Sequence, residues 1–335
     1  MAQTRIVSGQ KPTGRAHIGN YFGANRPWVE LQEDARYECF FFIADYHAIT
    51  VDWDPEGLRQ ATIDMTLDLL ACGLDPQRVV LFAQSHVSEH MELCWALNAF
   101  ASYGDLTRMT QFKEVREEAE EREAFVSAGL FDYPVLQAAD ILMYHAEKVP
   151  VGEDQVQHVE LTRRVARRFN SYLGDYFVEP EWWLSEAPRI RSLADPEKKM
   201  SKSYGDKHVI GLMEDEDSIY EKVKSAVTDV GPQADGMSPG IENLFRLLKL
   251  TAPPEVYDRL YGDYEGGSLK YVELKESLFE HLMATLRPVR DRRRQLTEPD
   301  AREVLQRGAE KASAVARQTI REIRQRVGVG PLSPP

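Results

Sequence analysis

Cysteine is scarce in this sequence, and long apolar runs are absent. The three cysteines, Cys39, Cys72 and Cys94, lie far apart in a chain of 335 residues, which argues against a disulfide framework and against a close-spaced metal or cluster motif. No apolar stretch approaches the roughly 20 residues of a membrane span, because Asp45 interrupts the run that begins at Phe40. The N-terminus also lacks the apolar region of a signal peptide. We therefore expect a soluble, cytoplasmic protein with buried thiols and no membrane partner.

An excess of positive charge is also lacking. The 54 acidic residues outnumber the 41 lysines and arginines and give a net charge of −13. This balance does not favour a nucleic-acid partner, because contacts with phosphates normally require surplus basic side chains. The charge is unevenly distributed, however, since residues 287–326 carry twelve basic and six acidic side chains. Solvated helix faces are one explanation of this basic segment and contact with RNA is the other; DNA is not expected.

The length of the chain indicates more than one folding unit. A chain of 335 residues exceeds one ordinary core, so we expect a large α/β domain and a smaller second domain. We place the first domain at 1–203 and an all-helical domain at 204–295. Residues 296–335 are expected to form a C-terminal helix that packs back on the first domain, followed by a frayed tail.

Apolar segments alternate with helical periodicity near the N-terminus. Buried strands are predicted at 6–7, 39–44 and 78–83, and a helix is predicted from about 17 to 31. Between the last two strands, Asp54 is expected to cap a helix that begins at Pro55 and is stopped by Gly73. This order predicts right-handed crossovers and a Rossmann-like, doubly wound parallel sheet, which binds ligands beyond the carboxyl ends of its strands.

Two short segments carry groups that suit a nucleoside triphosphate. Residues 12–20 (PTGRAHIGN) follow the first predicted strand, so that backbone N–H groups and the imidazole of His17 can meet phosphate. Residues 199–203 (KMSKS) place Lys199 and Lys202 three positions apart beside hydroxyl groups. Two ammonium groups in such a loop can stabilise the charge that develops on a leaving pyrophosphate.

A lone carboxylate, Asp140, lies at helical spacing within the apolar segment 133–142. Burying it without a partner would cost several kcal/mol, so it needs a donor. A structural role at a helix end or on the helix backbone would supply one. Acceptance of an N–H from a ligand is the other possibility, and both remain open at this stage.

In this order, segments 12–20 and 199–203 resemble the HIGH and KMSKS signatures of class I aminoacyl-tRNA synthetases, with Asn20 in place of the second histidine. Further blocks at 109–113, 133–142, 149–155 and 225–229 resemble bacterial tryptophanyl-tRNA synthetase, and the match extends from about residue 8 to 327. The resemblance implies a catalytic domain with the predicted sheet and a helical domain that reads the anticodon. It also implies a tryptophan–tRNA ligase, which activates L-tryptophan with ATP to tryptophanyl-adenylate, releases pyrophosphate and transfers the aminoacyl group to tRNA(Trp).

The resemblance further implies the residues of the site. The implied catalytic groups are His17, Asn20, Lys199 and Lys202. The implied ATP contacts are Lys11, Pro12, Thr13, Gly19, Asn20, Gly152, Glu153, Asp154, Ile190, Lys199, Met200, Ser201, Lys202 and Ser203. The implied tryptophan contacts are Val7, His47, Tyr133, Gln137, Asp140, Val149, Val151 and Gln155. Among these, Asp140 would accept the indole N–H, which suits a ring with one donor and a large apolar surface.

The cofactors implied by the resemblance are ATP and Mg²⁺. The magnesium ion is expected to be held by phosphates and water, so no protein metal ligand is predicted. The implied partners are L-tryptophan, tRNA(Trp) and a second copy of the chain in a homodimer. Two alternatives remain open: a tyrosyl-tRNA synthetase, which shares the fold and both signatures, and a paralogue that binds tryptophan without charging tRNA.

Some positions depart from the commonest family pattern. Lys11 stands where glutamine is frequent, Val7 where phenylalanine may stand, and Gln137 where methionine is usual. Val115 occupies a position where the family often has a lysine that helps to bind the triphosphate, and our hypothesis is that Lys113 or Arg116 replaces it. The acidic segment 114–123 is expected to be an exposed helix or a mobile loop.

Overall fold

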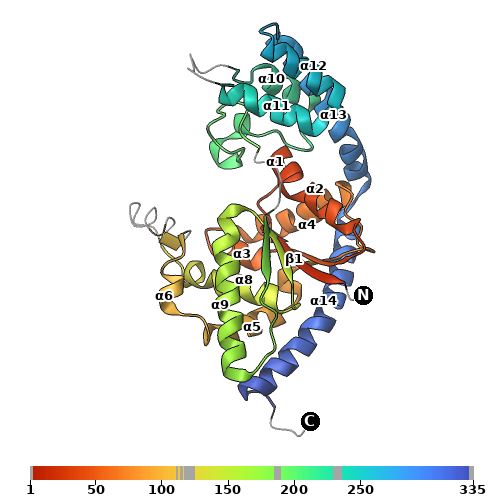
Figure 1. The fold of residues 1–335 in the computed structure, drawn as a ribbon. Helices are drawn as coiled ribbons and strands as arrows, with labels where there is room; N and C mark the ends of the chain where they lie inside the picture. Colours follow the sequence, from red (N-terminus) through yellow and green to blue (C-terminus); the bar gives the residue numbers. More distant parts are fainter. Residues whose placement is uncertain are drawn as a thin grey trace.

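The computed structural model describes residues 3–110, 112–113, 116, 125–184, 190–228 and 236–331, and at its centre is a parallel sheet (Figure 1). The five strands are β1 (Thr4–Gln10), β2 (Tyr37–Ile43), β3 (Val80–Ala83), β4 (Lys148–Val151) and β5 (Glu181–Leu184). Their order in the sheet is β3-β2-β1-β4-β5, and all neighbouring strands are parallel. The predicted Rossmann-like fold is therefore confirmed. The order reverses between β1 and β4, where such sheets bind ligands.

Helices surround this sheet and form most of the rest of the described chain. Those before residue 175 are α1 (Ile18–Asn20), the π-helical turn η1 (Tyr21–Asn25), α2 (Arg26–Gln32), α3 (Asp45–Ala48), α4 (Pro55–Ala71), η2 (Gln84–His86), α5 (Glu89–Asn98), α6 (Tyr103–Leu106), α8 (Ala128–Leu142), η3 (Glu153–Gln155) and α9 (Val156–Leu173). Those after residue 200 are η4 (Lys202–Tyr204), η5 (Asp206–His208), α10 (Glu216–Lys224), α11 (Pro239–Thr251), α12 (Pro254–Glu265), α13 (Tyr271–Gln295) and α14 (Glu298–Val327). Among the described helices, none is long and apolar enough to cross a membrane.

Local sequence signals account for several helix boundaries. The carboxylate of Asp54 accepts the N–H of Gly57 at 2.6 Å, Pro55 occupies the first turn of α4, and the chain leaves the helix through Gly73 at φ 107°. Glycine is favoured there because other residues rarely adopt positive φ. The helix predicted at 17–31 is interrupted by the π turn η1. The C-terminal helix starts at Glu298, because Thr297 and Asp300 form a capping box.

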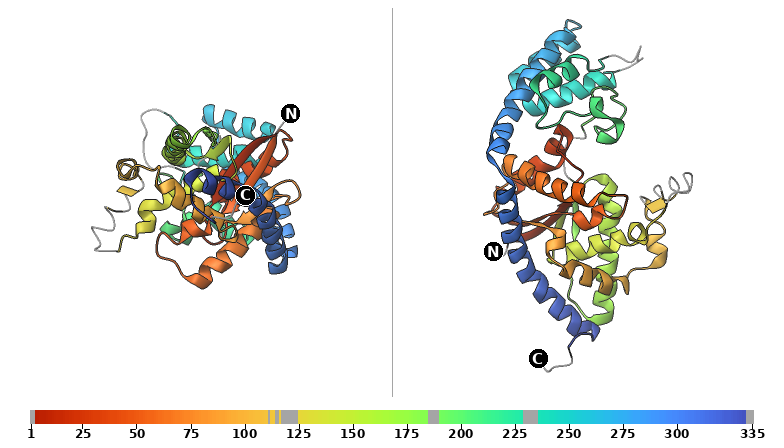
Figure 2. Two further views of the ribbon diagram at one scale, coloured as in Figure 1. Left: turned by 90° about the horizontal axis from the view of Figure 1, so that it is seen from below. Right: turned by 180° about the vertical axis from the view of Figure 1, so that it is seen from behind.

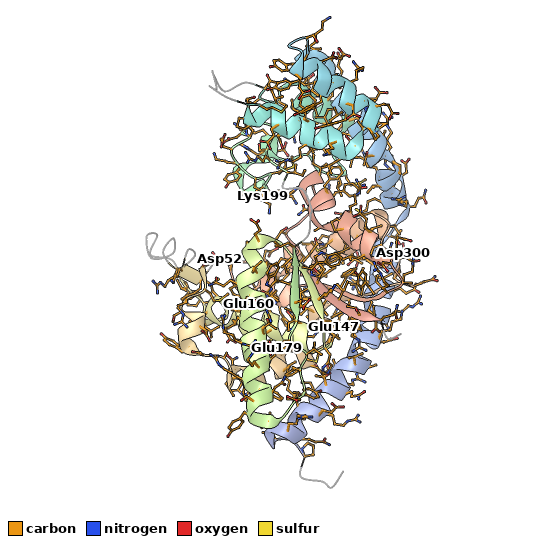
Figure 3. All side chains as sticks on the ribbon, viewed as in Figure 1. Asp52, Glu147, Glu160, Glu179, Lys199 and Asp300 are labelled. Atoms are coloured by element: carbon orange, nitrogen blue, oxygen red, sulfur yellow. The ribbon has the colours of Figure 1, made fainter. Side chains whose placement is uncertain are left out.

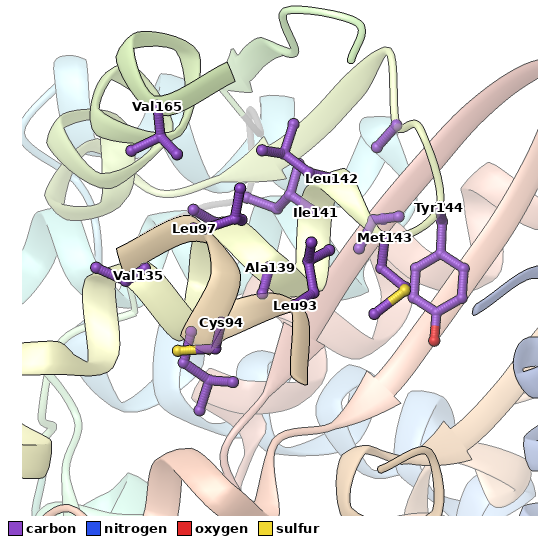
Figure 4. Packing of buried hydrophobic residues seen from close by; sticks show 14 of the residues in the cluster. Leu93, Cys94, Leu97, Val135, Ala139, Ile141, Leu142, Met143, Tyr144 and Val165 are labelled. Atoms are coloured by element: carbon purple, nitrogen blue, oxygen red, sulfur yellow. The ribbon is translucent and has the colours of Figure 1, made fainter. Parts of the chain in front are cut away.

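The two faces of the sheet are covered by different apolar clusters. On one face, α5, α8, α9 and α14 pack against the strands, and Figure 4 shows Leu93 and Leu97 of α5 beside Ile141 of α8. On the other face, Trp28 of α2 stacks on Phe41 of β2, with ring centroids 4.4 Å apart. Residues 39–43 of β2 are buried on both faces, as expected for a central strand of a parallel sheet.

The helices α10–α13 gather at one end of the molecule around a second apolar cluster (Figure 1). Ile18 of the first signature segment, Phe22 just after it, and Met200 of the second signature segment are buried in this same cluster. The backbone N–H of Ile18 also donates to the carbonyl of Ile210 at 2.9 Å. Both signature segments are thus anchored between the sheet and the helical lobe. The domain limits near 203 and 295 stay predictions.

The last helix, α14, runs from the helical lobe along the side of the sheet (Figure 2). It packs against β3, which is an edge strand, and against α4 and α5. The helix and the strand approach each other tightly at Gly308, where a Cβ atom would lie 1.7 Å from the carbonyl oxygen of Leu81. Only glycine allows the helix and the strand to come so close. This helix therefore covers one exposed edge of the sheet. The predicted frayed tail at 328–335 lies partly outside the described residues.

Candidate active site

A cavity of about 590 Å³ opens at the carboxyl ends of β1 and β4, where the strand order reverses. The predicted site residues that line it come from widely separated parts of the chain. They are Val7, Lys11, Asn20, His47, Tyr133, Gln137, Asp140, Val149, Val151, Gly152, Asp154, Gln155 and Lys199. The floor includes Phe42, whose ring lies against Gly9, since a Cβ atom there would be 2.4 Å from the ring. This glycine lets an aromatic ring rest directly on the β1 backbone.

Asp140 is the carboxylate at the bottom of this cavity, with only 1% of its surface exposed. Three donors surround it. Oδ2 pairs with His47 Nε2 at 2.7 Å, and Oδ1 pairs with Gln84 Nε2 at 2.7 Å and with His90 Nδ1 at 2.6 Å. Burial alone would raise the pKa of Asp140, but the hydrogen bonds from His47 and His90 lower it to about 2. The carboxylate is therefore ionised near neutral pH.

Gln84 and His90 were missed by sequence reasoning. Gln84 directly follows β3, at the same edge of the sheet as the cavity, and His90 lies in the first turn of α5. The end of the predicted strand at Ala83 was a usable signal for Gln84, because side chains that follow parallel strands face the ligand edge. The pairing of Asp140 with side chains from three other elements also answers the question left open above. Neither a helix cap nor the helix backbone satisfies it.

A second polar group lines the same cavity, about two turns before Asp140 on α8. The hydroxyl of Tyr133 pairs with His158 Nε2 at 2.8 Å, and the ammonium of Lys11 lies 5.5 Å from the Tyr133 ring centroid. Burial lowers the pKa of His158 to about 4 and raises the pKa of Tyr133 to about 12. Gln137 donates to Gln155 at 3.4 Å. This part of the cavity is polar and also contains the carboxyl group of Asp154, whose charge acts on Tyr133 and His158, and the ammonium of Lys11, whose pKa is lowered by burial.

The first signature segment is held by its own side chains. The N–H of His17 donates to Asn20 Oδ1 at 3.1 Å, so Asn20 stabilises the start of α1. A Cβ atom on Gly19 would lie 2.8 Å from the His17 ring, so only glycine leaves room for the imidazole. Burial, followed by the charges of Lys202 and Lys199, lowers the pKa of His17 to about 4. Its Nδ1 is buried and has no hydrogen-bond partner among the residues that the structure describes.

The two lysines of the second signature segment point to different places. Lys199 lines the main cavity, at the boundary between the helical lobe and the sheet (Figure 3). Lys202 instead donates to the carbonyls of Thr13 and Arg15 and lines a neighbouring cavity of about 790 Å³ together with His17. Lys202 thus ties the second signature segment to the first.

The remaining predicted ATP contacts do not line the main cavity. Ile190 and Met200 are buried, and the N–H of Met200 donates to the carbonyl of Ile190 at 3.0 Å. The hydroxyls of Ser201 and Ser203 pair with each other at 2.8 Å. The others are Pro12, Thr13, Gly19 and Glu153. Val115 and the rest of segment 114–123, apart from Arg116, lie outside the described residues, so the hypothesis about the missing lysine stays a prediction.

Many basic side chains of 287–326 are engaged within the chain. Arg293 pairs with Asp68 at 2.9 Å and with Asp64 at 3.0 Å, and Asp68 also accepts the N–H of Ala16 at 3.1 Å. Arg324 forms a bidentate ion pair with Glu92, in which Nε and Nη2 each lie 2.6 Å from a carboxylate oxygen. These contacts hold α13 and α14 against the sheet domain. Through Asp68 they also reach the first signature segment.

Comparison with known proteins gives close relatives over nearly the whole chain. A family model described as tRNA synthetases class I (W and Y) matches residues 1–287. The tryptophan–tRNA ligase of Caldanaerobacter subterraneus subsp. tengcongensis is 45% identical, with 97% of this chain and 98% of that protein covered. Tryptophan–tRNA ligase 2 of Streptomyces avermitilis is 44% identical, with 98% and 97% covered. The crystal structure of Campylobacter jejuni tryptophanyl-tRNA synthetase complexed with ADP and tryptophan aligns with a TM-score of 0.83 and 35% identity, covering 97% of this chain and 100% of that chain.

Proposed function

The chain belongs to the class I tRNA synthetases for tryptophan and tyrosine and is a bacterial-type tryptophan–tRNA ligase, and we propose that its main cavity binds tryptophan next to ATP. The reaction joins the carboxylate of tryptophan to the α-phosphate of ATP, releases pyrophosphate and then transfers the aminoacyl group to tRNA. The tyrosyl alternative and the non-charging paralogue are not favoured, because the close relatives are tryptophan ligases.

One observation carries the assignment of the tryptophan pocket, namely an ionised carboxylate that lines a cavity together with apolar side chains. An ionised carboxyl group offers about four lone-pair sites, and the three protein donors of Asp140 leave one of them free. An indole N–H would fill that site. Val7, Val149 and Val151 line the same cavity and would pack on the ring. A phenol in this slot would leave polar groups poorly paired, which disfavours tyrosine.

The other end of the cavity is proposed to hold the reacting groups. Tyr133 and Gln155 would bind the α-amino group of tryptophan, and Lys199 would meet the triphosphate. The attacking carboxylate belongs to the substrate, so alignment and charge stabilisation are what the chain supplies. His17 supports such a role because its buried Nδ1 has no hydrogen-bond partner within the described residues. Lys202 is proposed to leave the carbonyls of 13 and 15 when phosphate binds.

ATP is a substrate of this family, and we propose that Mg²⁺ accompanies it. Magnesium retains water and prefers substrate phosphates over an all-protein cage. Within the described ranges, His, Cys, Asp and Glu form no group of three that would hold a metal ion. The triphosphate and water would therefore hold the ion, and it would neutralise charge on the leaving pyrophosphate.

The arrangement with partners is also a proposal. The helical lobe α10–α13 would read the anticodon, and the enzyme would act as a cytoplasmic homodimer. Support for the dimer comes from α5, which exposes Met91 and, with 81% of its surface accessible, Trp95 one turn later. Trp95→Glu is expected to lower the mass measured by light scattering if this surface is the contact.

The direct test is amino-acid-dependent ATP–pyrophosphate exchange, run with all twenty amino acids on the wild type, Asp140→Asn and Asp132→Asn. Asp132 is a matched control on the same helix, since it pairs with Asn98 and does not line the cavity. Exchange should occur with tryptophan alone. Loss of a hydrogen bond to a charged group, about 1.5–3 kcal/mol, predicts a decrease in kcat/KM for tryptophan of about 10- to 150-fold in Asp140→Asn only. Equal values in both variants would refute the assignment of Asp140.

A further inference from the structure

His90 is completely buried and links Asp140 to a tyrosine on the far side from the cavity. Its Nδ1 lies 2.6 Å from Asp140 Oδ1, and its Nε2 lies 2.7 Å from the hydroxyl of Tyr144, which is itself fully buried. His90 does not line the cavity. A side chain in this place touches no substrate, so any influence on binding has to pass through Asp140.

The direction of these hydrogen bonds follows from the carboxylate. An ionised carboxylate only accepts, so Nδ1 of His90 carries a hydrogen and donates it to Asp140. In a neutral imidazole, Nε2 then accepts from the Tyr144 hydroxyl. Burial raises the pKa of Tyr144 well above its usual value, so its hydroxyl keeps the hydrogen that it donates. Tyr144 therefore fixes which nitrogen of His90 faces the carboxylate.

The imidazole ring is also held by aromatic neighbours. The ring centroids of Tyr144, Phe82 and Phe42 lie 5.5, 5.9 and 6.1 Å from that of His90. Phe82 and Phe42 belong to the sheet, on β3 and β2. The donor is thus placed by the core of the domain and not by a loop, which favours a precise position.

The three donors are divided unequally between the two carboxylate oxygens. Oδ1 accepts from both Gln84 and His90, whereas Oδ2 accepts only from His47, which lines the cavity. Since each oxygen offers about two lone-pair sites, Oδ1 is filled and the free site is on Oδ2. The two donors on Oδ1 prevent rotation of the carboxylate that would exchange the oxygens.

We propose that His90 is a positioning residue for tryptophan, which together with Tyr144 holds Asp140 so that Oδ2 faces the indole N–H. The inference rests on the proposed tryptophan pocket, because it assigns a second layer to the residue that contacts the ring. It predicts that substitution of His90 changes recognition of the indole N–H more than it changes the chemical step.

The test compares tryptophan with 3-(3-benzothienyl)alanine, in which sulfur replaces the indole N–H. Pyrophosphate exchange gives kcat/KM for each substrate in the wild type, His90→Leu, His90→Asn and Tyr144→Phe. His90→Leu removes the donor, and loss of the positioned acceptor is expected to lower the tryptophan-to-analogue ratio about tenfold. His90→Asn keeps a donor at the same distance along the side chain and should restore most of the ratio. Tyr144→Phe should lower it by a smaller factor, and KM for ATP should not change.

Each outcome decides between this inference and simpler explanations. A purely structural role predicts lower activity with both substrates and an unchanged ratio in His90→Leu, and that result would overturn the proposal. If His90→Leu does not fold, the other two variants still test the proposal. An unchanged tryptophan-to-analogue ratio in Tyr144→Phe, or a tenfold loss of the ratio in His90→Asn, would contradict the positioning role of His90. If Asp140→Asn also leaves the ratio unchanged, the proposed pocket itself is wrong.

Discussion

The contact between α14 and β3 at Gly308 makes a quantitative prediction about stability. A Cβ atom at this position would lie 1.7 Å from the carbonyl oxygen of Leu81 and 2.5 Å from its carbon. Both atoms belong to the backbone of a strand, so they cannot rotate away as a side chain would. Gly308→Ala therefore requires the helix to move by more than an ångström, since real contacts of a Cβ atom begin near 3.0 Å.

The magnitude follows from two opposing effects. Replacing glycine by alanine inside a helix stabilises it by about 1 kcal/mol. Overpacking in a core typically costs about 1–3 kcal/mol, and here the retreat of the helix also loosens Leu305, Ala309 and Ala312, which are buried beside Gly308. We expect the upper part of that range, and a net decrease in the free energy of unfolding of about 2 kcal/mol.

Gly262 provides a matched control for this substitution. It lies inside α12, and nothing is within 4 Å of the position that its Cβ atom would occupy. Gly262→Ala is expected to raise the free energy of unfolding by up to about 1 kcal/mol. Urea unfolding followed by circular dichroism measures both variants, and Gly308→Ala should move the midpoint down while Gly262→Ala leaves it unchanged or moves it up. An increase of similar size in both would refute the close approach of α14 to the sheet.

Three further predictions concern the active site. His158→Gln should make the protein less sensitive to acid. The pKa of His158 is about 4 in the folded state, compared with its ordinary value of 6.5, so at intermediate pH the folded state binds fewer protons than the unfolded state. The contribution of neutral His158 to the free energy of unfolding is complete above pH 6.5 and decreases as the pH falls from 6.5 to 4, by about 2 kcal/mol at pH 5. Urea midpoints of the wild type and the variant at pH 7 and pH 5 measure this difference. Lys199→Ala should lower kcat for pyrophosphate exchange by a factor of about 10²–10³. The adjacent Lys198 pairs with Asp195 outside the cavity, so Lys198→Ala should leave kcat near the wild-type value. Gly19→Ala should displace the His17 imidazole and lower kcat by up to about 10²-fold, with an unchanged circular dichroism spectrum; wild-type exchange in this variant would contradict the packing of the ring on Gly19.

The parts of the fold with a strong local signal could be predicted from the sequence. The apolar run at 39–44 indicated a central parallel strand, and Asp54 with Pro55 indicated the start of α4. These features depend on neighbouring residues, so a single sequence contains them. The π turn at Tyr21–Asn25 could not be predicted in this way. It lies in a segment whose helical periodicity is otherwise continuous.

The direction of individual side chains was harder to predict than their presence at the site. Lys199 and Lys202 are three positions apart in one signature segment, yet they face different cavities. Lys202 is bound by the carbonyls of Thr13 and Arg15, almost 190 positions earlier in the chain. The spacing of the lysines indicated two cations near phosphate, but it did not reveal that backbone carbonyls of the first signature segment hold one of them.

Asp140 shows the limit of sequence reasoning most clearly, because half of its environment could be predicted. A carboxylate within an apolar helix requires donors, and that requirement follows from the cost of burying a charge. Its donors, however, come from positions 47, 84 and 90, on three elements that only the sheet topology brings together. The need for hydrogen-bond donors follows from the local sequence, whereas the donors themselves are supplied by tertiary contacts. The same division explains why His90, which touches no cavity, escaped notice although it fixes the orientation of the carboxylate.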